Sequence, residues 1–309
     1  MRFKFIAKPP LKKSIKKEFL IFKKKFYTEI ELTQRDGEKR ALNLAKKAFK
    51  EGFERIVAVG GDGTTNEVLN GILEAAREIN PKFYKNPQKF FSHFAMGIIP
   101  GGFANDFAQE IGIPKDPKKA FLTLSQGKKI FVDIGKVDQR YFANCLSFGF
   151  DAQINEEANK FKERYRFIPK FSSYLLPAIK KIIKEVPKFD IEIEGEEIKF
   201  EGKAVLVAIT NTKRYGKIFK INPQADFSDG KLNLCLAKPI GKLKALYDVF
   251  LLSQGKHLHL PEIKTFEFTK PLFLRSLTSL PSEVDGEILE PKKEYQIEVL
   301  SKILPILVP

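Results

Sequence analysis

One short stretch, residues 56–72 (IVAVGGDGTTNEVLNGI), restricts the possible folds of this chain most strongly. It begins with four apolar residues before a glycine, a pattern typical of a buried parallel strand. The glycines that follow let the backbone turn sharply and approach a ligand closely. Apolar residues then recur at helical spacing. Strand, glycine loop and helix amino terminus together form a phosphate-binding geometry, because free N–H groups and the positive end of the helix dipole converge on an anion.

The residues of this loop favour phosphate binding, although glycines alone would also suit a plain strand–helix turn. Asp62 is the most informative of them. A carboxylate inside a phosphate-binding loop would repel the ligand unless a cation lies between them or the carboxylate orients a nucleophile. Thr64 and Thr65 suit the cap of the following helix. The spacing is neither that of a P-loop nor that of a dinucleotide loop. The candidate phosphate-binding residues are Gly60, Gly61, Asp62, Gly63, Thr64, Thr65, Asn66 and Glu67.

Length and composition limit the number of domains and the class of protein that this chain can form. The 309 residues allow two domains, and 43% hydrophobic residues are enough for a core in each. Cys145 and Cys235 lie in apolar surroundings, so we expect reduced structural thiols and no disulfide framework. We expect neither a signal peptide nor a membrane-spanning helix, because the apolar runs are short and interrupted by lysines.

A second glycine loop, residues 97–108 (GIIPGGFANDFA), completes a recognisable pair. The two loops together resemble the catalytic domain of the diacylglycerol kinase family of lipid kinases. G-G-D-G-T alone also occurs in NAD kinases and phosphofructokinases, but its N-E-V-x-N-G continuation and the second loop are similar to lipid kinases. The resemblance implies an amino-terminal Rossmann-like α/β nucleotide-binding domain and a carboxy-terminal antiparallel β-sandwich.

The resemblance also implies further nucleotide contacts. Thr33 matches a threonine at the end of the second strand, with a helix or turn cap as the alternative. Gly102 and Asn105 belong to the second loop. Two departures stand out. Phe103 replaces the usual threonine, so a hydroxyl contact is replaced by an aromatic ring that can stack on or enclose a base. The family's first phosphate turn, Asn-Pro-x-Ser-Gly, is altered to KPPLKKS at residues 8–14.

Cation ligands are implied at three places. The turn NPQADFSDGKL at residues 222–232 is similar to a magnesium-binding turn, whose ligand positions fall on Asp226, Asp229 and the backbone carbonyl of Lys231. Oxygen ligands of this kind suit Mg²⁺ or Ca²⁺, whereas Asp-Gly is also an ordinary turn pair. Asp133 matches an acid tied by water to magnesium, or else it is a buried cap. Asp106 orders its loop, helps to place a cation, or simply caps a helix.

The D-G-E sequence at residues 285–287 is the implied catalytic centre. As a local pattern, Asp-Gly predicts a β-hairpin turn. By resemblance, Glu287 is the general base, Asp285 holds its carboxylate in place, and Asp62 assists a catalytic Mg²⁺. The resemblance therefore implies an ATP- and Mg²⁺-dependent lipid kinase.

The periodicity changes along the chain in agreement with two domains. Strands alternate with helices up to residue 133, whereas strands follow one another afterwards, which indicates an antiparallel sandwich. We place the α/β domain at residues 1–133, with residues 293–309 returning to it. The sandwich spans residues 134–292 and contains a helical insertion at 155–185. The latter part of this insertion, YLLPAIKKIIKE, is either a basic amphipathic helix on an acidic bilayer or a helix packed on the sheet.

The net charge of +16 fits an enzyme that works at an anionic membrane surface. Solubility, or a charged surface of the heat-adapted kind, explains it equally well, and no nucleic-acid motif is present. We expect a cytoplasmic protein peripheral to the inner membrane face, with a homodimer as the ordinary oligomer. Diacylglycerol is the default acceptor. Phosphatidylglycerol, monoacylglycerol, an undecaprenol-like lipid and a sphingoid base stay open. So do an NAD-kinase-like activity and a catalytically silent nucleotide- or lipid-binding regulator.

Overall fold

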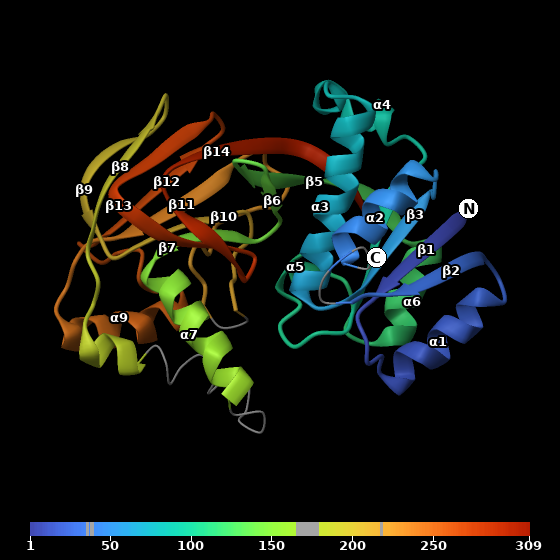
Figure 1. Ribbon diagram of the computed structural model, residues 1–309, viewed down its shortest axis with the longest axis horizontal. Coiled ribbons are helices and arrows are strands. Elements are labelled where there is room, and N and C mark those ends of the chain that lie inside the picture. The colour runs from blue at the N-terminus through green and yellow to red at the C-terminus, as the bar shows by residue number, and fades with distance from the viewer. Residues whose placement is uncertain (35–36, 38–39, 165–178, 217–218) are drawn as a thin grey trace. The chain divides into compact units, whose positions relative to one another are not determined.

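Strands and helices alternate through the first part of the computed structural model, which describes residues 1–34, 37, 40–164, 179–216 and 219–309 (Figure 1). The first compact unit comprises Met1–Ile134, Phe227–Gly230 and Leu300–Pro309. Its strands run in the order β14-β4-β3-β1-β2, and each of these pairs is parallel. Its elements are β1 (Arg2–Ala7), α1 (Lys13–Lys23), β2 (Tyr27–Leu32), α2 (Ala41–Lys50), β3 (Arg55–Gly60), α3 (Asp62–Ile79), η2 (Phe83–Lys85), α4 (Pro87–Phe90), β4 (Ala95–Pro100), α5 (Asp106–Glu110), α6 (Pro117–Gln126), the first part of β5 (Lys128–Val137) and the last part of β14 (Glu287–Val308).

Helices cover both faces of this parallel sheet. Figure 1 shows α2 and α3 on one face and α1 and α6 on the other. Gly71 lets α3 approach α2 closely, because a Cβ there would lie 2.2 Å from the carbonyl oxygen of Leu42. On the other face, the ring of Phe121 in α6 stacks on Phe5 of β1 at a centroid distance of 5.9 Å. Burial on both faces explains why β3 and β4 are continuous apolar runs.

The second compact unit comprises Gly135–Asp226 and Lys231–Val299 and is built from antiparallel strands. Their order is β12-β11-β10-β7-β13-β14, and β8 pairs with both β13 and β9. The core contains the buried rings of Phe148, Phe268 and Tyr295 among aliphatic side chains. The elements are the end of β5, β6 (Arg140–Phe142), β7 (Cys145–Gly149), α7 (Phe150–Arg164), β8 (Phe189–Gly195), β9 (Lys199–Ala204), β10 (Leu206–Thr210), β11 (Leu232–Ala237), α9 (Lys242–Gln254), β12 (Ile263–Phe268), β13 (Leu272–Val284) and the first part of β14.

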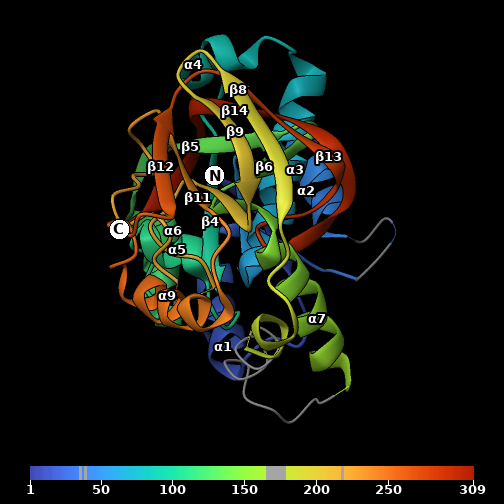
Figure 2. The same ribbon diagram turned by 90° about the vertical axis from the view of Figure 1, so that its left-hand side faces the viewer.

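A small helical layer accompanies these strands. Residues of α7, of a helical turn at 179–184 and of α9 share a separate apolar cluster. Figure 2 shows α9 and the end of α7 at the same end of this unit. The predicted insertion at 155–185 begins earlier, at Phe150, and its residues 165–178 lie outside the described part of the chain. Helix α9 was not predicted, since its apolar residues do not follow a single helical stripe.

The start of α3 differs from the prediction. The helix after the first glycine loop begins at Asp62 with Gly61 as its cap, so the prediction that Thr64 or Thr65 caps it was wrong. Residues 189–204 form two antiparallel strands, β8 and β9. Residues 80–92, which connect α3 to β4, contain η2 and α4.

The two units divide after Ile134, and Leu300 begins the returning segment. The corresponding predictions were residues 133 and 293. Within the described residues, no helix combines the length and apolarity required to cross a bilayer.

Candidate functional site

The two glycine loops of the first unit meet backbone to backbone. The N–H groups of Gly101 and Gly102 donate to the carbonyl oxygen of Gly60 at 2.6 and 3.2 Å. A Cβ on Gly102 would lie 2.4 Å from the Cα of Gly61, so only glycine fits this contact. By contrast, a Cβ on Gly63 would meet nothing within 4 Å, and this residue is exposed in the first turn of α3. The loops therefore leave open space at the amino end of that helix.

Asp62 joins the two loops. Its carboxylate accepts hydrogen bonds from the backbone N–H of Asn105 at 2.8 Å and of Phe107 at 3.4 Å. Burial raises the pKa of Asp62, and these N–H donors partly oppose that shift by stabilising the carboxylate. The predicted cation-associated residue therefore also fixes the position of the second loop.

Asn105 shapes the second loop from within. It has a left-handed backbone (φ 51°), which asparagine tolerates better than most residues. Its Oδ1 accepts from the N–H of Gly102 at 2.9 Å, and its Nδ2 donates to the carbonyl of Gly102 at 3.1 Å. The amide thus closes the turn around Gly102. Phe103, the residue in place of the usual threonine, lies exposed on this turn.

The other predicted nucleotide residues also have contacts inside the unit. Thr64, Thr65 and Asn66 are buried in the first turns of α3. Glu67 accepts from the N–H of Ala41 at 2.9 Å and pairs with Arg40, so it caps the start of α2.

Thr33 is buried directly after β2, and its N–H donates to the carbonyl of Ala7 at 2.9 Å. The observed contacts of Thr33 and Glu67 hold neighbouring segments around the loops.

Asp133 is a fully buried carboxylate in the same unit. It accepts from the N–H of Gly230 and of Lys302, each at 2.6 Å, while its own N–H donates to the carbonyl of Phe227 at 2.7 Å. Burial raises its pKa against the effect of these donors. These bonds fit the buried cap, which is one of the two alternatives left open by the sequence. Asp133 holds the turn at 227–230 and the left-handed Lys302 (φ 47°).

The predicted cation ligands form no ready-made acidic cage. Asp226 and Asp229 are exposed in their turn, and the ammonium of Lys231 lies 2.8 Å from Glu267. Asp106 starts the short helix α5. Among the described residues no group of three or more His, Cys, Asp or Glu side chains is placed to hold a metal. The chemistry of the predicted donors, two exposed carboxylates and a backbone carbonyl, nevertheless fits a hard cation that retains water ligands.

The D-G-E sequence of the second unit forms the two-residue hairpin between β13 and β14. Val284 pairs with Glu287 across a turn in which Asp285 and Gly286 have φ of 46° and 87°. Positive φ at both central residues is the geometry that Asp-Gly favours. The buried carboxylate of Asp285 accepts from three successive N–H groups, those of residues 143–145, at 2.8, 2.9 and 2.9 Å. The side chain of the turn residue Asp285 thus fixes the position of the hairpin.

Glu287 follows this turn and is half-buried. It forms an ion pair with Arg140 of β6, a residue that no motif in the sequence singled out. The resemblance implied that Asp285 holds the carboxylate of Glu287 in place. In the structure the carboxylate of Asp285 bonds the backbone of residues 143–145, and Arg140 is the cation that orients Glu287.

A buried acidic network beside the hairpin was also missed. Glu283 is buried and accepts from Ser147 Oγ at 3.2 Å, and from Tyr215 and Asn155. Asn155 also donates to the carbonyl of Gly286 at 3.2 Å. Burial, followed by the charge of nearby Asp151, holds the pKa of Glu283 well above its usual range. No spacing could reveal this network, because its members come from separate strands, a helix and a loop.

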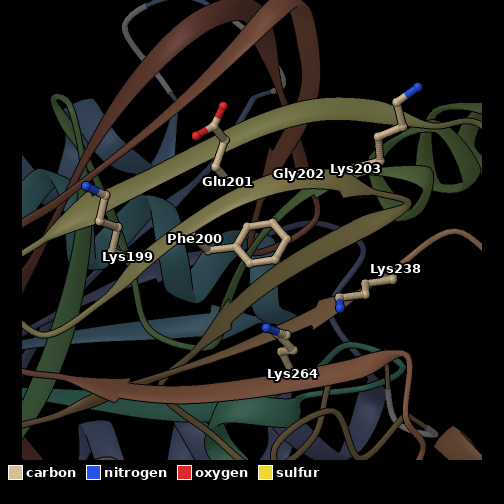
Figure 3. Close-up of a pocket in the computed structure, with 7 residues that line it drawn as sticks. All are labelled: Lys199, Phe200, Glu201, Gly202, Lys203, Lys238 and Lys264. Carbon is tan, nitrogen blue, oxygen red and sulfur yellow. The ribbon is translucent and has the colours of Figure 1, made fainter.

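Two hollows occur away from these loops. One of about 500 Å³ in the second unit is basic (Figure 3), and Lys264 Nζ lies 5.5 Å from the ring centroid of Phe200 there. It is lined by Lys199, Phe200, Glu201, Gly202, Lys203, Lys238 and Lys264. The other, of about 560 Å³, lies in the first unit between the turn at 227–228 and the last residues of the chain. Neither hollow contains a glycine loop.

Comparisons with known proteins agree with the two-unit organisation. Residues 11–137 match the diacylglycerol kinase catalytic domain, and residues 144–308 match the YegS C-terminal NAD kinase beta sandwich-like domain. A crystal structure of a diacylglycerol kinase from Bacillus anthracis superposes with a TM-score of 0.74 over 100% of this chain and 97% of that one, at 22% identity. An NAD kinase from Archaeoglobus fulgidus in complex with ATP superposes with a TM-score of 0.51 over 99% and 93%, at 11% identity. These likenesses confirm the predicted fold class.

The sequence matches place the chain more closely. The diacylglycerol kinase of Staphylococcus carnosus is 30% identical over 263 residues, which are 85% of this chain and 78% of that protein. The diacylglycerol kinase of Staphylococcus aureus is 31% identical over 244 residues, 79% and 71% of the two chains. Fold and loops define a lipid kinase, a phosphotransferase with an alcohol group as acceptor. The chain belongs to the diacylglycerol kinase catalytic-domain family.

Proposed function

We propose that this protein transfers the γ-phosphate of ATP to the free hydroxyl of diacylglycerol and so forms phosphatidic acid. The observation that supports it most is the contact of the two glycine loops, Gly60–Gly61 with Gly101–Gly102, beside the open amino end of α3. The names of the relatives at about 30% identity support diacylglycerol as the acceptor. The ATP complex of the NAD kinase with a similar fold supports ATP as the donor.

The glycine loops supply the donors for the nucleotide. Backbone N–H groups at the start of α3 would bind the phosphates, since a helix amino terminus attracts negative charge and Gly63 leaves room for the ligand. Asp62 and Asn105 hold the two loops in register, which fixes these donors before the nucleotide arrives. Such fixed donors favour phosphoryl transfer, a reaction that depends mainly on positioning and charge neutralisation.

Glu287 would act on the acceptor. The lipid hydroxyl oxygen forms a bond to the γ-phosphorus, the bond from that phosphorus to the β,γ-bridging oxygen breaks, and the hydroxyl proton passes to the carboxylate of Glu287. ADP leaves with the bridging oxygen. Arg140 keeps the carboxylate of Glu287 in one orientation, and Asp285 fixes the hairpin that carries it. Positioned general bases contribute roughly 10²–10⁴ in rate.

Mg²⁺, when bound, would neutralise phosphate charge. The residues that would hold cations are Asp62 at the first glycine loop and Asp226, Asp229 and the carbonyl of Lys231 in the turn at 222–232. Asp106 and the buried Asp133 would support these ligands from their hydrogen-bonded positions. Removal of divalent cations with EDTA should abolish turnover, and added Mg²⁺ should restore it.

The test is a panel of acceptors incubated with γ-labelled ATP and Mg²⁺. It contains diacylglycerol, monoacylglycerol, phosphatidylglycerol, undecaprenol, a sphingoid base and NAD. We expect labelled phosphatidic acid as the main product. Preferential labelling of another lipid would change the acceptor, and labelled NADP would favour the soluble-substrate kinase. Absence of label from every acceptor, with ATP still bound, would favour a silent regulator.

We further propose that the protein works as a peripheral protein at the anionic inner face of the cytoplasmic membrane. The net charge of +16 supports this, because each exposed lysine near an anionic bilayer contributes about 1 kcal/mol of attraction.

A further inference from the structure

Helix α9 has apolar side chains on two opposite faces. One face packs inward, where Ala245 is buried and Val249 is partly buried against the small helical cluster. On the opposite face Leu243, Tyr247 and Phe250 are 86%, 58% and 59% exposed. Their spacing of four and three residues places them on one stripe. A helix that is apolar all round is normally covered on every side, so the outer stripe is suited to a second apolar environment.

A neighbouring segment extends this stripe. Lys242, at the start of α9, donates from Nζ to the carbonyls of Ile183 and Lys184 at 2.8 and 2.9 Å. This contact places the helical turn at 179–184 beside α9, and Figures 1 and 2 show both at the same end of the second unit. Ile183 is 60% exposed there. We call Ile183, Leu243, Tyr247 and Phe250 the α9 face.

Exposed lysines accompany the α9 face, together with one exposed acid, Glu185, next to Lys184. Lys180 and Lys184 are exposed on the neighbouring turn, and Lys256 is exposed just beyond the end of α9. The single acid within α9, Asp248, is buried and lies 3.4 Å from Lys244. Exposed apolar and aromatic side chains with lysines around them match the interface of an anionic bilayer, where rings and alkyl chains enter the acyl boundary and ammonium groups stay at the headgroups.

We propose that the α9 face is the surface by which this protein docks onto an anionic lipid bilayer. The proposal deepens the proposed function, since a kinase for a bilayer lipid must reach its acceptor at that surface. A second copy of the chain is the other candidate occupant. A symmetric dimer through this face would bring the lysines of both copies together, and like charges oppose such a contact.

The chain contains no tryptophan, so one introduced indole reports its own surroundings. Leu243→Trp is the probe. Leu277→Trp is the matched control, because Leu277 is 75% exposed on β13 of the same unit. Each variant is titrated with phosphatidylglycerol–phosphatidylcholine vesicles. We expect a blue shift for Leu243→Trp, with quenching by lipids brominated in the acyl chain, and neither effect for Leu277→Trp. Equal responses of both probes, or none from Leu243→Trp when the protein sediments with vesicles, would overturn the proposal.

Replacing apolar residues of the α9 face tests how much they contribute to the free energy of vesicle binding. The double variant Leu243→Gln/Phe250→Gln should partition into the same vesicles at least roughly tenfold more weakly, whereas Leu277→Gln should bind like the parent protein. All three positions are exposed, so we expect the variants to stay folded, and thermal unfolding of each variant checks this. Unchanged partitioning of the folded double variant would contradict the proposal.

A charge-matched pair separates docking from general attraction. Lys180→Gln/Lys184→Gln and Lys199→Gln/Lys203→Gln each remove two positive charges, but the second pair lies at the basic hollow of Figure 3. We expect the first pair to weaken vesicle binding roughly tenfold or more and the second to have a clearly smaller effect. Equal losses would mean that net charge, and not the α9 face, drives binding.

Two further measurements complete the test: sedimentation, which gives the oligomeric state, and turnover with a soluble acceptor. If Leu243→Trp is already blue-shifted without lipid, and a dimer in solution dissociates on Leu243→Glu, the face is a self-association surface and the proposal is wrong.

Vesicle binding is measured without turnover, so its result does not depend on whether diacylglycerol is the acceptor. With a short-chain diacylglycerol below its micelle concentration, Leu243→Gln/Phe250→Gln should retain parent turnover. Loss of that turnover would place these residues in the acceptor site and overturn a docking role.

Discussion

The glycine-loop region of the first unit and the hairpin region of the second are built on different principles. The loop region brings backbone against backbone, with Gly60 accepting from Gly101 and Gly102. The hairpin region is held by carboxylates. Asp285 is bonded by N–H groups about 140 residues earlier in the chain, and Glu287 by Arg140. A backbone site needs particular residues in short consecutive motifs, whereas a side-chain site collects its members from distant segments.

The largest expected effect comes from Asp62→Asn, which tests whether the loop region needs a charge as well as a shape. Asparagine keeps one oxygen that can accept from Asn105 but removes the negative charge available to a cation. We expect Mg²⁺-dependent turnover to fall at least as far as after loss of a general base, roughly 10²–10⁴-fold. Thermal unfolding shows whether the loops stay folded. If turnover survives in Mg²⁺, the loop works by shape alone and the cation assignment is wrong.

Glu287→Gln tests the hairpin region, and we expect it to lower turnover almost as much as Asp62→Asn. The amide keeps the size of the side chain but cannot take a proton, so turnover should fall roughly 10²–10⁴-fold while the affinity for ATP changes little. Steady-state kinetics and equilibrium ATP binding measure the two quantities. Glu290→Gln, an exposed change three residues further along β14, is the matched control. Unchanged lipid phosphorylation by Glu287→Gln would remove this residue from the base role.

Two glycine substitutions separate shape from binding in the loop region. In Gly102→Ala the new methyl would meet the Cα of Gly61 at 2.4 Å, so we expect a loss of about 3 kcal/mol in the free energy of unfolding together with loss of turnover. In Gly63→Ala the methyl meets nothing, and alanine favours the helix by up to about 1 kcal/mol.

Gly63→Ala should therefore unfold no earlier than the parent protein and yet bind ATP more weakly. Chemical denaturation and ATP titration measure both. Equal ATP affinity for Gly63→Ala and the parent would mean that this open space is not the phosphate site.

The smallest effect concerns the buried acid beside the hairpin. Burial raises the pKa of Glu283 in the folded protein, whereas the unfolded chain has a value of about 4.3. Between these values the folded state holds a proton that the unfolded state has released, so this group lowers stability as pH rises. Glu283→Gln removes that dependence.

The Tm of Glu283→Gln relative to the parent protein should therefore increase from pH 5 to pH 8, by at least about 3 °C. Thermal scans across this range, with Glu290→Gln as the control, measure it. A Tm difference that stays constant with pH would show that Glu283 is charged in the folded state.

The difference between the glycine-loop region and the hairpin region explains which parts of the fold and the site could be predicted from the sequence. Parallel strands with apolar runs, and glycines that no other residue can replace, leave a local pattern, so β3, β4 and both loops could be found from spacing. Asp285–Gly286 was equally visible as a hairpin, because it needs positive φ at both residues. The resemblance to lipid kinases then supplied roles that no local pattern contains.

The remaining features had no local pattern. Arg140 and Glu283 acquire their partners only when strands and helices distant in sequence come together. Helix α9 escaped prediction for a different reason: its apolar residues surround the helix, so they show no single stripe. The start of α3 was misplaced because Gly61, with no side-chain oxygen, stands where a threonine was expected to cap.

The buried carboxylate of Asp133 has a consequence for the order in which the chain matures during synthesis. Its backbone donors Gly230 and Lys302 are made long after it, the second 169 residues later. Until residues 300–309 have left the ribosome, this acid has neither a complete set of partners nor the last strand of its sheet. The nascent first unit therefore stays partly assembled while the whole of the second unit is translated, although amino-terminal domains usually fold first.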